Sequence, residues 1–200
     1  RKIMSISQIK RNAKKNLSGK WGLAIGLFLI MGLLIGITSF IFVGPIIIAG
    51  PLMLGFYICY LKMQRNQDVE FEELFSGFNN FVTSMVTYLL IFIYTFLWSL
   101  LFIIPGIIKA LSYSMSLFIL ADNPNMKANE AITKSKEMMN GHKWELFLLY
   151  LSFIGWMLLT ILTFGILVIY VGPYMYASLA AFYEEIKGPS ISVEEPNEFE

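Results

Sequence analysis

The sequence predicts an all-α integral membrane protein with six transmembrane helices, arranged as three helical hairpins, and amphipathic helices at the cytoplasmic interface. Composition is the first observation behind this prediction. Of the 200 residues, 56% are hydrophobic and 14% are charged, whereas about 25% are charged in a typical soluble domain. The mean hydropathy is +0.65. The second observation is that the apolar residues form long runs, each close to the roughly 20 residues with which a helix crosses a bilayer.

Six apolar runs are present, and the connections between them alternate between short and long. The runs occupy residues 21–42, 46–63, 81–104, 105–121, 144–164 and 165–183. Short turns join the two runs of each pair, and the polar linkers 64–80 and 122–143 separate the pairs. Residues 1–183 are therefore predicted to form one membrane domain of three tight hairpins. Residues 184–200 form an acidic tail with Glu194, Glu195, Glu198 and Glu200.

The distribution of basic residues predicts the orientation. Residues 1–20 carry seven of the 15 Lys and Arg residues and no acidic residue. The long linkers with their flanking residues and the tail carry seven more, so that Lys109 is the exception. Cytoplasmic loops of membrane proteins are enriched in Lys and Arg. Both termini and both long linkers are therefore predicted to be cytoplasmic, with three short turns on the outer side.

An amphipathic stretch precedes each hairpin. The apolar positions, spaced as on one helix face, are Ile6, Ile9, Ala13 and Leu17; Phe71, Leu74, Phe75, Phe78 and Phe81; and Ala128, Ala131, Ile132, Met138 and Met139. We predict helices that lie in the cytoplasmic interface. The unit of interfacial helix, span, turn and span then occurs three times, in about residues 1–63, 64–122 and 123–183. This indicates an internal repeat, although any chain of hairpins looks repetitive.

Prolines and glycines within the runs predict local features of the helices. Pro51, Pro105 and Pro173 are predicted to kink their helices, because proline removes a backbone hydrogen bond. Pro51 and Pro173 occupy matching positions in the first and third units, a pattern that accompanies binding sites in transporters, although proline also serves packing alone. The first run has G-x-x-x-G spacings that begin at Gly22 and Gly32, and we predict close helix contacts there inside the bundle.

Lys109 is the one ionisable residue deep within the apolar runs, and intramembrane charge marks a candidate functional site. Ser112, Tyr113 and Ser116 follow it at i+3, i+4 and i+7 and form a polar stripe on the fourth run. These four residues are the candidate ligand or pathway residues. The alternative is that the stripe only packs against neighbouring helices. In that case Lys109 extends its side chain to the nearby outer interface.

The basic residues before the first run are candidate contacts for lipid headgroups. They are Lys10, Arg11, Lys14, Lys15 and Lys20. Each basic side chain near an anionic membrane surface contributes about 1 kcal/mol to binding. The same cluster also acts as the topology signal, so it does not by itself require lipid binding. The predicted partners are therefore membrane lipids and a protein on the cytoplasmic face.

The sequence contains no motif that indicates catalysis. H-E-x-x-H, G-x-S-x-G and glycine-rich phosphate loops are absent, as are paired carboxylates within the apolar runs. His142 and Cys59 are the only His and Cys residues and lie far apart in the sequence, so neither a metal site nor a cofactor is predicted. The net charge of +1 gives no field that would attract nucleic acid. We therefore expect a protein that is not an enzyme, and the sequence does not indicate its oligomeric state.

Several motifs, in order along the chain, resemble one protein family. They are I-K-x-N-A-K-x-N-L-x-G-x-W in residues 9–21, L-F-x-G-F in 74–78, I-I-P-G-I-I-K-A-x-x-Y-S-M in 103–115, A-I-T-K-S-K-E-M-M-N-G in 131–141, L-S-F-I-G-W in 151–156 and V-G-P-Y in 171–174. The chain thus resembles the domain-of-unknown-function 975 family of bacterial integral membrane proteins. The resemblance implies a six-helix protein of the bacterial cytoplasmic membrane, and it implies no activity. It makes motif positions of Pro105, Lys109, Tyr113, Gly141, Pro173 and Tyr174.

Two functions are compatible with these observations. The first is a non-enzymatic membrane module that binds lipids or a partner protein, as an accessory to a transport or cell-envelope system. Amphipathic cytoplasmic helices and an acidic tail, without an outer domain, favour it. The second is a small-solute carrier or channel whose pathway follows the polar stripe of the fourth run. A water-accessible cavity around Lys109 would favour the second function, and a packed stripe the first.

Overall fold

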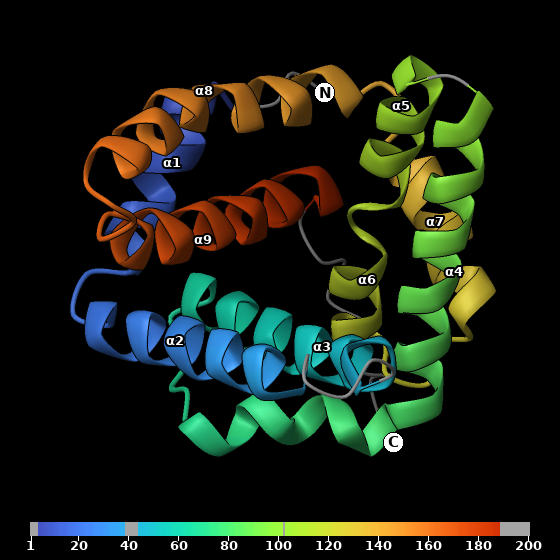
Figure 1. The fold of residues 1–200 in the computed structure, drawn as a ribbon, viewed down its shortest axis with the longest axis horizontal. Helices are drawn as coiled ribbons and strands as arrows, with labels where there is room; N and C mark the ends of the chain where they lie inside the picture. The colour runs from blue at the N-terminus through green and yellow to red at the C-terminus, as the bar shows by residue number, and fades with distance from the viewer. Residues whose placement is uncertain (1–3, 39–43, 102, 189–200) are drawn as a thin grey trace, which may run out of the picture.

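The computed structural model describes residues 4–38, 44–101 and 103–188, and these form helices joined by turns (Figure 1). The helices are α1 (Ile6–Asn16), α2 (Trp21–Thr38), α3 (Gly44–Gln64), the 3₁₀ helix η1 (Phe71–Asn80), α4 (Phe81–Leu101), α5 (Ile103–Tyr113), α6 (Ser116–Asp122), α7 (Ala128–Met138), α8 (Lys143–Leu162) and α9 (Val168–Lys187). The predicted all-α class is confirmed. The three amphipathic stretches form α1, η1 and α7. The tail begins within α9, whereas Glu194, Glu195, Glu198 and Glu200 lie outside the described residues.

Among the described residues, four helical segments are long and apolar enough to cross a membrane. They are Ile47–Gln64, Phe71–Ser99, Ile104–Asp122 and Lys143–Leu162. A fifth arises if α1 and α2, which meet at an angle of 97°, are taken together as one broken span. Several candidate spans indicate a multi-pass membrane protein, but the predicted number of six is not shown. α9 is outside this set because its tyrosines and the charged residues of its last turn lower its hydropathy.

The core lies around α3 and α9, which contact each other in the middle of the molecule (Figure 1). Phe56 and Tyr60 of α3 pack on Tyr176 of α9, with ring centroids 4.8 and 6.1 Å apart. Phe118 of α6 stacks on Tyr183 of α9 at 5.4 Å. Buried aromatic rings contribute large apolar areas and favourable ring contacts. α3, α6 and α9 therefore form an apolar centre to which the other helices attach.

Consecutive long helices pack as pairs, α2 with α3, α4 with α5, and α8 with α9. The pairs do not share one direction. In Figure 1, α4 and α5 stand at the right and run across the direction of α2, α3, α8 and α9. This arrangement differs from a simple bundle, in which three hairpins would run side by side along one axis. Whether each pair crosses the membrane therefore stays a prediction.

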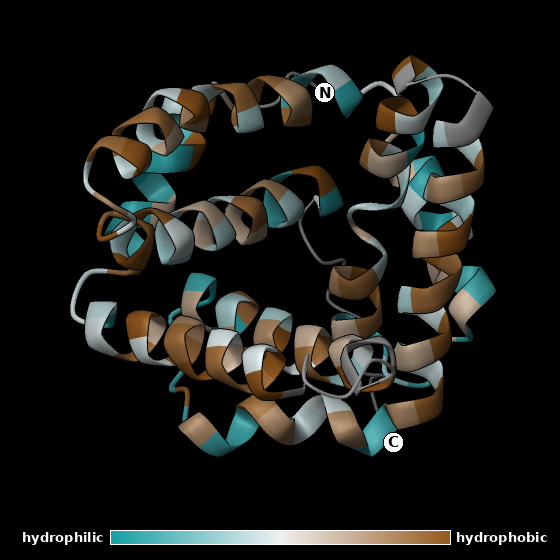
Figure 2. Cartoon of the chain, viewed as in Figure 1, coloured by the Kyte–Doolittle hydropathy of each residue, from teal (hydrophilic) through white to brown (hydrophobic). Residues whose placement is uncertain are grey.

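The helices α2, α4, α5 and α8 are rich in apolar residues (Figure 2). Exposed apolar side chains include Leu29, Leu33 and Ile37 of α2, Phe92, Phe96 and Leu97 of α4, Ile104 and Ile107 of α5, and Ile154, Leu158 and Leu162 of α8. Large contiguous apolar patches are rare on soluble monomers and mark contact with protein or membrane. Lipid chains would solvate such a surface. The exposed side chains thus agree with placement in a bilayer.

α1 and α7 turn their apolar faces toward the protein, where an interfacial helix would turn them toward lipid, whereas η1 buries Leu74 and leaves Phe71 and Phe75 exposed. Ile9 and Ala13 of α1, Leu74 of η1 and Ile132 of α7 are all buried. α1 contacts α9, η1 contacts α3, and α7 contacts α4 and α6. The apolar spacing thus predicts these helices correctly. Their buried faces complete the protein core, because the long helices leave grooves that these shorter helices fill.

The fourth predicted span is interrupted after Tyr113, where α5 ends and α6 begins three residues later, at Ser116. The hydroxyl of Ser112 donates to the carbonyl of Ile108, and that of Ser114 donates to the carbonyl of Leu111, both at 2.8 Å. Serine side chains that bond to preceding carbonyls bend helices. Hydropathy does not register this effect, so the sequence predicts one continuous span.

The three prolines fall into two structural groups. Pro51 and Pro173 lie inside α3 and α9, which continue through them. Pro105 lies in the first turn of α5, because α5 begins at Ile103. In a first turn proline has no helical hydrogen bond to remove. Pro105 is thus the third residue of α5 as described, and the kinks at all three prolines stay predictions.

The predicted glycine contacts of α2 are found at one of the four glycines. A Cβ added at Gly22, Gly32 or Gly36 would meet no atom within 4 Å. One at Gly26 would overlap the ring of Phe71 in η1. Gly26 therefore lies close to another helix, whereas the second G-x-x-x-G spacing does not. The reason is rotational: α2 turns Gly22, Gly32 and Gly36 outward, which spacing along one helix does not reveal.

Two contacts join residues that the predicted topology separates. Trp21, at the predicted cytoplasmic end of the first span, stacks on Tyr170 with ring centroids 4.8 Å apart. Tyr170 follows the predicted outer turn between the fifth and sixth spans. Ile104, at the predicted outer end of the third span, and Trp144, at the predicted cytoplasmic end of the fifth, line one groove. Three side-by-side spanning pairs would place the members of each contact at opposite faces.

Candidate functional site: a cavity beside Lys109

Lys109 lies in a cavity of about 400 Å³ between α4, α5 and α7. The lining residues are Tyr94 and Trp98 of α4, Lys109 and Tyr113 of α5, and Asn129, Ile132, Thr133 and Lys136 of α7. Neighbouring members on each helix are one, three or four positions apart, which places them on one side of that helix. The structure therefore brings two of the four predicted stripe residues together with residues of α4 and α7 that the sequence did not connect to them.

Each lysine of the cavity contacts an aromatic ring. The Nζ of Lys109 lies 4.5 Å from the centroid of the Trp98 ring, and that of Lys136 lies 5.5 Å from the centroid of Tyr113. Tyr113 in turn packs on Tyr94 at 6.0 Å. Among the described residues, neither lysine forms an ion pair. Cation–π contacts hold an ammonium group without using its N–H donors, so both lysines keep donors for a ligand.

The charge of the cavity is positive. No acidic side chain is among its lining residues, and Glu130 and Glu137 of α7 line a neighbouring depression instead. Thr133 and Asn129 add a hydroxyl and an amide to the two ammonium groups. This set suits an anion, because lysine is a compact cation that binds phosphate groups. In the described part of the chain, no three His, Cys, Asp or Glu side chains could hold a metal ion together.

Ser112 and Ser116, the other two predicted stripe residues, do not line this cavity. Both are buried. The Ser112 hydroxyl is bonded within α5, and the Ser116 hydroxyl has no hydrogen-bond partner among the described residues. Ser116 lies beyond the break between α5 and α6. The stripe therefore ends at Tyr113.

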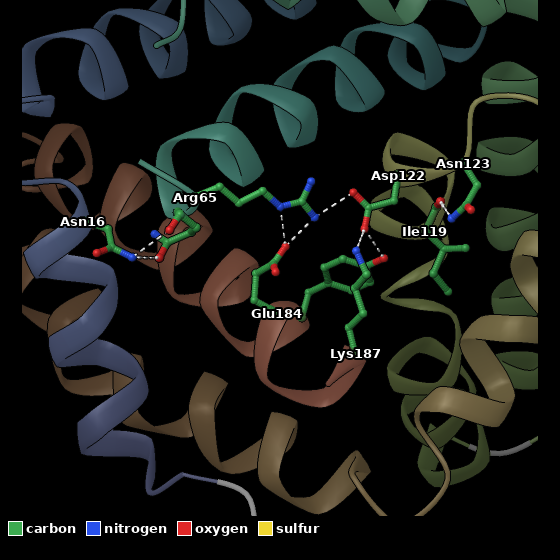
Figure 3. A network of polar contacts seen from close by, with 9 residues as sticks. Asn16, Arg65, Ile119, Asp122, Asn123, Glu184 and Lys187 are labelled. Carbon is green, nitrogen blue, oxygen red and sulfur yellow. Dashed lines mark hydrogen bonds and ion pairs between the residues drawn. The ribbon is translucent and has the colours of Figure 1, made fainter. Parts of the chain in front are cut away.

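A second polar cluster, which sequence reasoning missed, joins the C-terminal ends of α3, α6 and α9 (Figure 3). Asp122 accepts hydrogen bonds from Arg65 at 2.7 Å and from the hydroxyl of Tyr183 at 2.9 Å, and it also accepts one from Lys187. Arg65 also donates to Glu184. The only signal in the sequence is that each charged residue lies within four positions of the end of an apolar run, which is equally typical of a linker.

This cluster is a structural clamp. Burial alone would lower the pKa of Arg65, but its hydrogen bonds with Asp122 and Glu184 raise it. The side chain of Asp122 is 8% exposed, and a charge so far removed from water needs partners. The carboxylate accepts hydrogen bonds from three donors on two other helix ends, so its hydrogen-bonding capacity is used within the protein. The cluster therefore holds three helices together and does not offer a binding site.

The predicted headgroup contacts before α2 differ in their availability. The Nζ of Lys10 lies 3.2 Å from the Ser152 hydroxyl and 4.0 Å from the centroid of the Phe153 ring. Lys20 donates to the carbonyl of Gln67 at 2.6 Å. The exposed members of the cluster are Arg11, Lys14 and Lys15. These three can reach a lipid headgroup without breaking a contact of the fold, and that role stays a prediction.

Helices with an apolar outer surface, candidate spans and a cationic cavity define a class: a helical membrane protein with a site suited to an anion. The chain belongs to the family described as protein of unknown function (DUF975), whose profile matches residues 4–112 and 100–190. This confirms the resemblance found in the motifs. No curated protein and no solved structure matches the chain. The family description assigns no activity, so the geometry of the cavity is what indicates a function.

Proposed function

We propose that this protein is a non-enzymatic membrane module that binds an anionic lipid, with the headgroup in the Lys109 cavity. It would serve as an accessory to a transport or cell-envelope system of the bacterial cytoplasmic membrane. The observation that carries the proposal is the pairing of Lys109 with Lys136 in a cavity without an acidic lining residue. The other predicted binding partner of this module is a protein on the cytoplasmic face.

The surroundings of the cavity support a lipid as the source of the anion. Phe96 and Leu97 of α4 and Ile107 of α5 are exposed and apolar, so acyl chains can lie along the same helices that position the lysines. Tyr and Trp rings are frequent where headgroups meet hydrocarbon. The hydroxyl of Thr133 can donate to phosphate oxygens beside the two ammonium groups.

Binding of phosphatidylglycerol and phosphatidylcholine to the delipidated protein, followed by native mass spectrometry, tests the proposal. We expect phosphatidylglycerol to bind more tightly. Substituting both lysines (K109Q with K136Q) should weaken its binding about 25-fold, since one basic residue near an anionic lipid is worth about 1 kcal/mol, or about fivefold in affinity. Phosphatidylcholine binding should change much less, because its headgroup carries no net charge.

Two further variants control for charge and folding. Lys134→Gln removes the same charge from the same helix, but Lys134 lines the neighbouring depression, so lipid binding should be retained. The Arg substitutions K109R and K136R keep both charges and should retain most of the binding. An unchanged preference in the double Gln variant would exclude the cavity as the site. Co-purification of a protein, with no lipid retained, would instead identify the module as a protein-binding one.

A small-solute carrier or channel is the second candidate, and the cavity beside Lys109 and Tyr113 is the observation that favours it. Ser112 and Ser116, which the predicted pathway would use, are buried outside the cavity, and this weighs against it. Uptake of inorganic phosphate into proteoliposomes tests the idea. Lys109→Met and Tyr113→Phe should each reduce uptake if the stripe is the pathway, and unchanged uptake would remove it.

We infer further that both termini are cytoplasmic, because 14 of the 15 basic residues lie in the termini, the long linkers and their flanks. Six spans satisfy this arrangement. Four spans, or two, also satisfy it if one or two of the three hairpins enter and leave the membrane at one face. The contact between Trp21 and Tyr170 points to the α8–α9 pair. The groove shared by Ile104 and Trp144 and the cavity shared by Lys109 and Lys136 point in the same way to the α4–α5 pair.

A further inference from the structure

The turn between α8 and α9 exposes apolar side chains. Phe164 is 98% exposed, Ile161 and Leu162 are each 75% exposed, and Ile166 is 73% exposed. Residues 158–171 contain no charged side chain. Turns in water are usually rich in polar residues, which bond to the backbone or to solvent. The composition of this turn is therefore unlike that of an aqueous loop.

The backbone donors of the turn are all used within the protein. Every N–H from Thr163 to Val171 has an acceptor in the chain. Gly165, with φ of +88°, allows the chain to reverse, and its N–H bonds to the carbonyl of Thr160 at 2.9 Å. The hydroxyl of Thr163 accepts from the N–H of Leu167 and donates to carbonyls of α8. Such complete pairing is required where there is no water.

Four aromatic residues gather beside the turn. Trp21 of α2 stacks on Tyr170 of α9 at 4.8 Å, and Trp156 of α8 and Tyr174 of α9 lie 6.2 and 6.3 Å from the ring of Tyr170. Trp and Tyr concentrate at the level where headgroups meet hydrocarbon. Phe164 precedes Tyr170 by six residues, so the turn reaches about 5–10 Å beyond this aromatic cluster.

We propose that the α8–α9 turn is a membrane-inserted tip, with the aromatic cluster at headgroup level and residues 161–169 in the hydrocarbon. Trp21 follows the basic cluster of α1, so the tip enters from the face at which α1 lies. α8 and α9 then form a hairpin that enters the bilayer and returns without crossing it. This hairpin accounts for the contact between Trp21 and Tyr170, which a spanning pair would place at opposite faces.

Lipid fits the tip better than a second copy of the chain or another protein. Exposed residues are adjacent in sequence, Ile161 with Leu162 and Val168 with Ile169, and adjacent residues of a helix point in different directions. A protein interface would cover one side of the tip, whereas lipid surrounds it. The apolar surface also continues along α8, of which only 17% is buried within the protein.

Depth-dependent fluorescence quenching tests the proposal. The buried Cys59 is replaced by Ala, and Phe164→Cys carries an environment-sensitive fluorophore in vesicles of phosphatidylcholine and phosphatidylglycerol. We expect emission shifted to shorter wavelength. Quenching should be strongest by nitroxides on the acyl chain near the headgroup, with little quenching by aqueous iodide. Ile166→Cys should behave in the same way and guards against a local effect of one substitution.

Ser18→Cys, in the exposed turn before Trp21, is the matched control. It should react with a membrane-impermeant maleimide from one face, while Phe164→Cys should react from neither. Reaction of Phe164→Cys from the face opposite Ser18 would overturn the proposal, because the turn would then be an aqueous loop of a spanning hairpin. Protection that disappears when the protein is diluted in excess lipid would also overturn it, since a second copy would then cover the tip.

Discussion

Gly55 and Gly77 let α3 and η1 pack with their backbones in contact. A Cβ on Gly77 would overlap the carbonyl oxygen of Pro51, and one on Gly55 would overlap that of Leu74. The obstacles are backbone atoms, so no side-chain rotation relieves them. We expect Gly77→Ala to lower the free energy of unfolding by about 3 kcal/mol, measured by reversible unfolding in mixed detergent micelles.

Gly155→Ala on α8 is the matched control for this prediction. A Cβ at Gly155 meets no atom within 4 Å, and alanine is the better helix former by up to about 1 kcal/mol. Its stability should be unchanged or slightly raised. Equal losses for the two substitutions would contradict the close packing of η1 on α3. The sequence did not single out Gly55, and it placed Gly77 in the L-F-x-G-F motif without indicating a packing role, because a glycine's value for packing depends on which element faces it.

Asp122 connects three helix ends through a carboxylate that is almost buried. Asp122→Asn leaves Arg65 and Lys187 without their anionic partner, and we expect a loss of about 2 kcal/mol in the free energy of unfolding. Lys62→Gln is the control, because the Lys62–Glu73 pair has side chains 36% and 26% exposed and should cost less than about 1 kcal/mol. Chemical unfolding of the two variants gives the comparison, and a larger loss for Lys62→Gln would refute it.

At the scale of an element, α1 is held antiparallel to α9. The hydroxyl of Tyr174 donates to the carbonyl of Lys10, and the N–H of Met4 donates to Glu185 near the end of α9. Ile9 is buried in this contact. We expect Ile9→Ala to lower the free energy of unfolding by about 3 kcal/mol and to speed hydrogen exchange throughout α1.

Lys14→Ala tests whether this effect belongs to the buried face. Lys14 is exposed on the same helix, and alanine keeps the helix propensity high, so exchange in α1 should stay close to that of the unaltered protein. If Ile9→Ala and Lys14→Ala left exchange in α1 equally slow, the docking of α1 on α9 would not be what orders this helix.

The elements also show what local sequence can and cannot specify. Periodic apolar residues predicted helices at α1, η1 and α7, because a helix with one apolar face has that spacing whatever covers the face. The same periodicity could not tell protein from membrane as the covering surface. The break after Tyr113 was missed for a different reason: the bonds of the Ser112 and Ser114 hydroxyls to earlier carbonyls do not change hydropathy.

At the scale of the whole molecule, the sequence predicts some of the residues that line the candidate site and misses others. Lys109 and Tyr113 follow from charge in an apolar run and from helical spacing. Lys136 and Trp98 come from α7 and α4, and nothing local in the sequence connects those helices to α5. α7 packs against both α4 and α5, at the right of Figure 1, and this packing brings the residues together. It is a property of the folded chain.

The side of the membrane on which each linker lies is the last prediction. We expect Ser18→Cys, Asn140→Cys and Ser190→Cys, each made with Cys59→Ala, to be unreactive toward an impermeant maleimide in intact cells and reactive after permeabilisation. Basic residues next to all three positions, among them Lys20, Lys143 and Lys187, favour the cytoplasmic side. Four crossings and six crossings both meet this expectation, because every hairpin returns the chain to its starting face. The alternative is five crossings, as in the count that joins α1 to α2 and omits α9. In that case Ser190, alone of the three positions, would lie outside the cell. Labelling of Ser190→Cys in intact cells would therefore show that α9 does not return the chain to the cytoplasmic face.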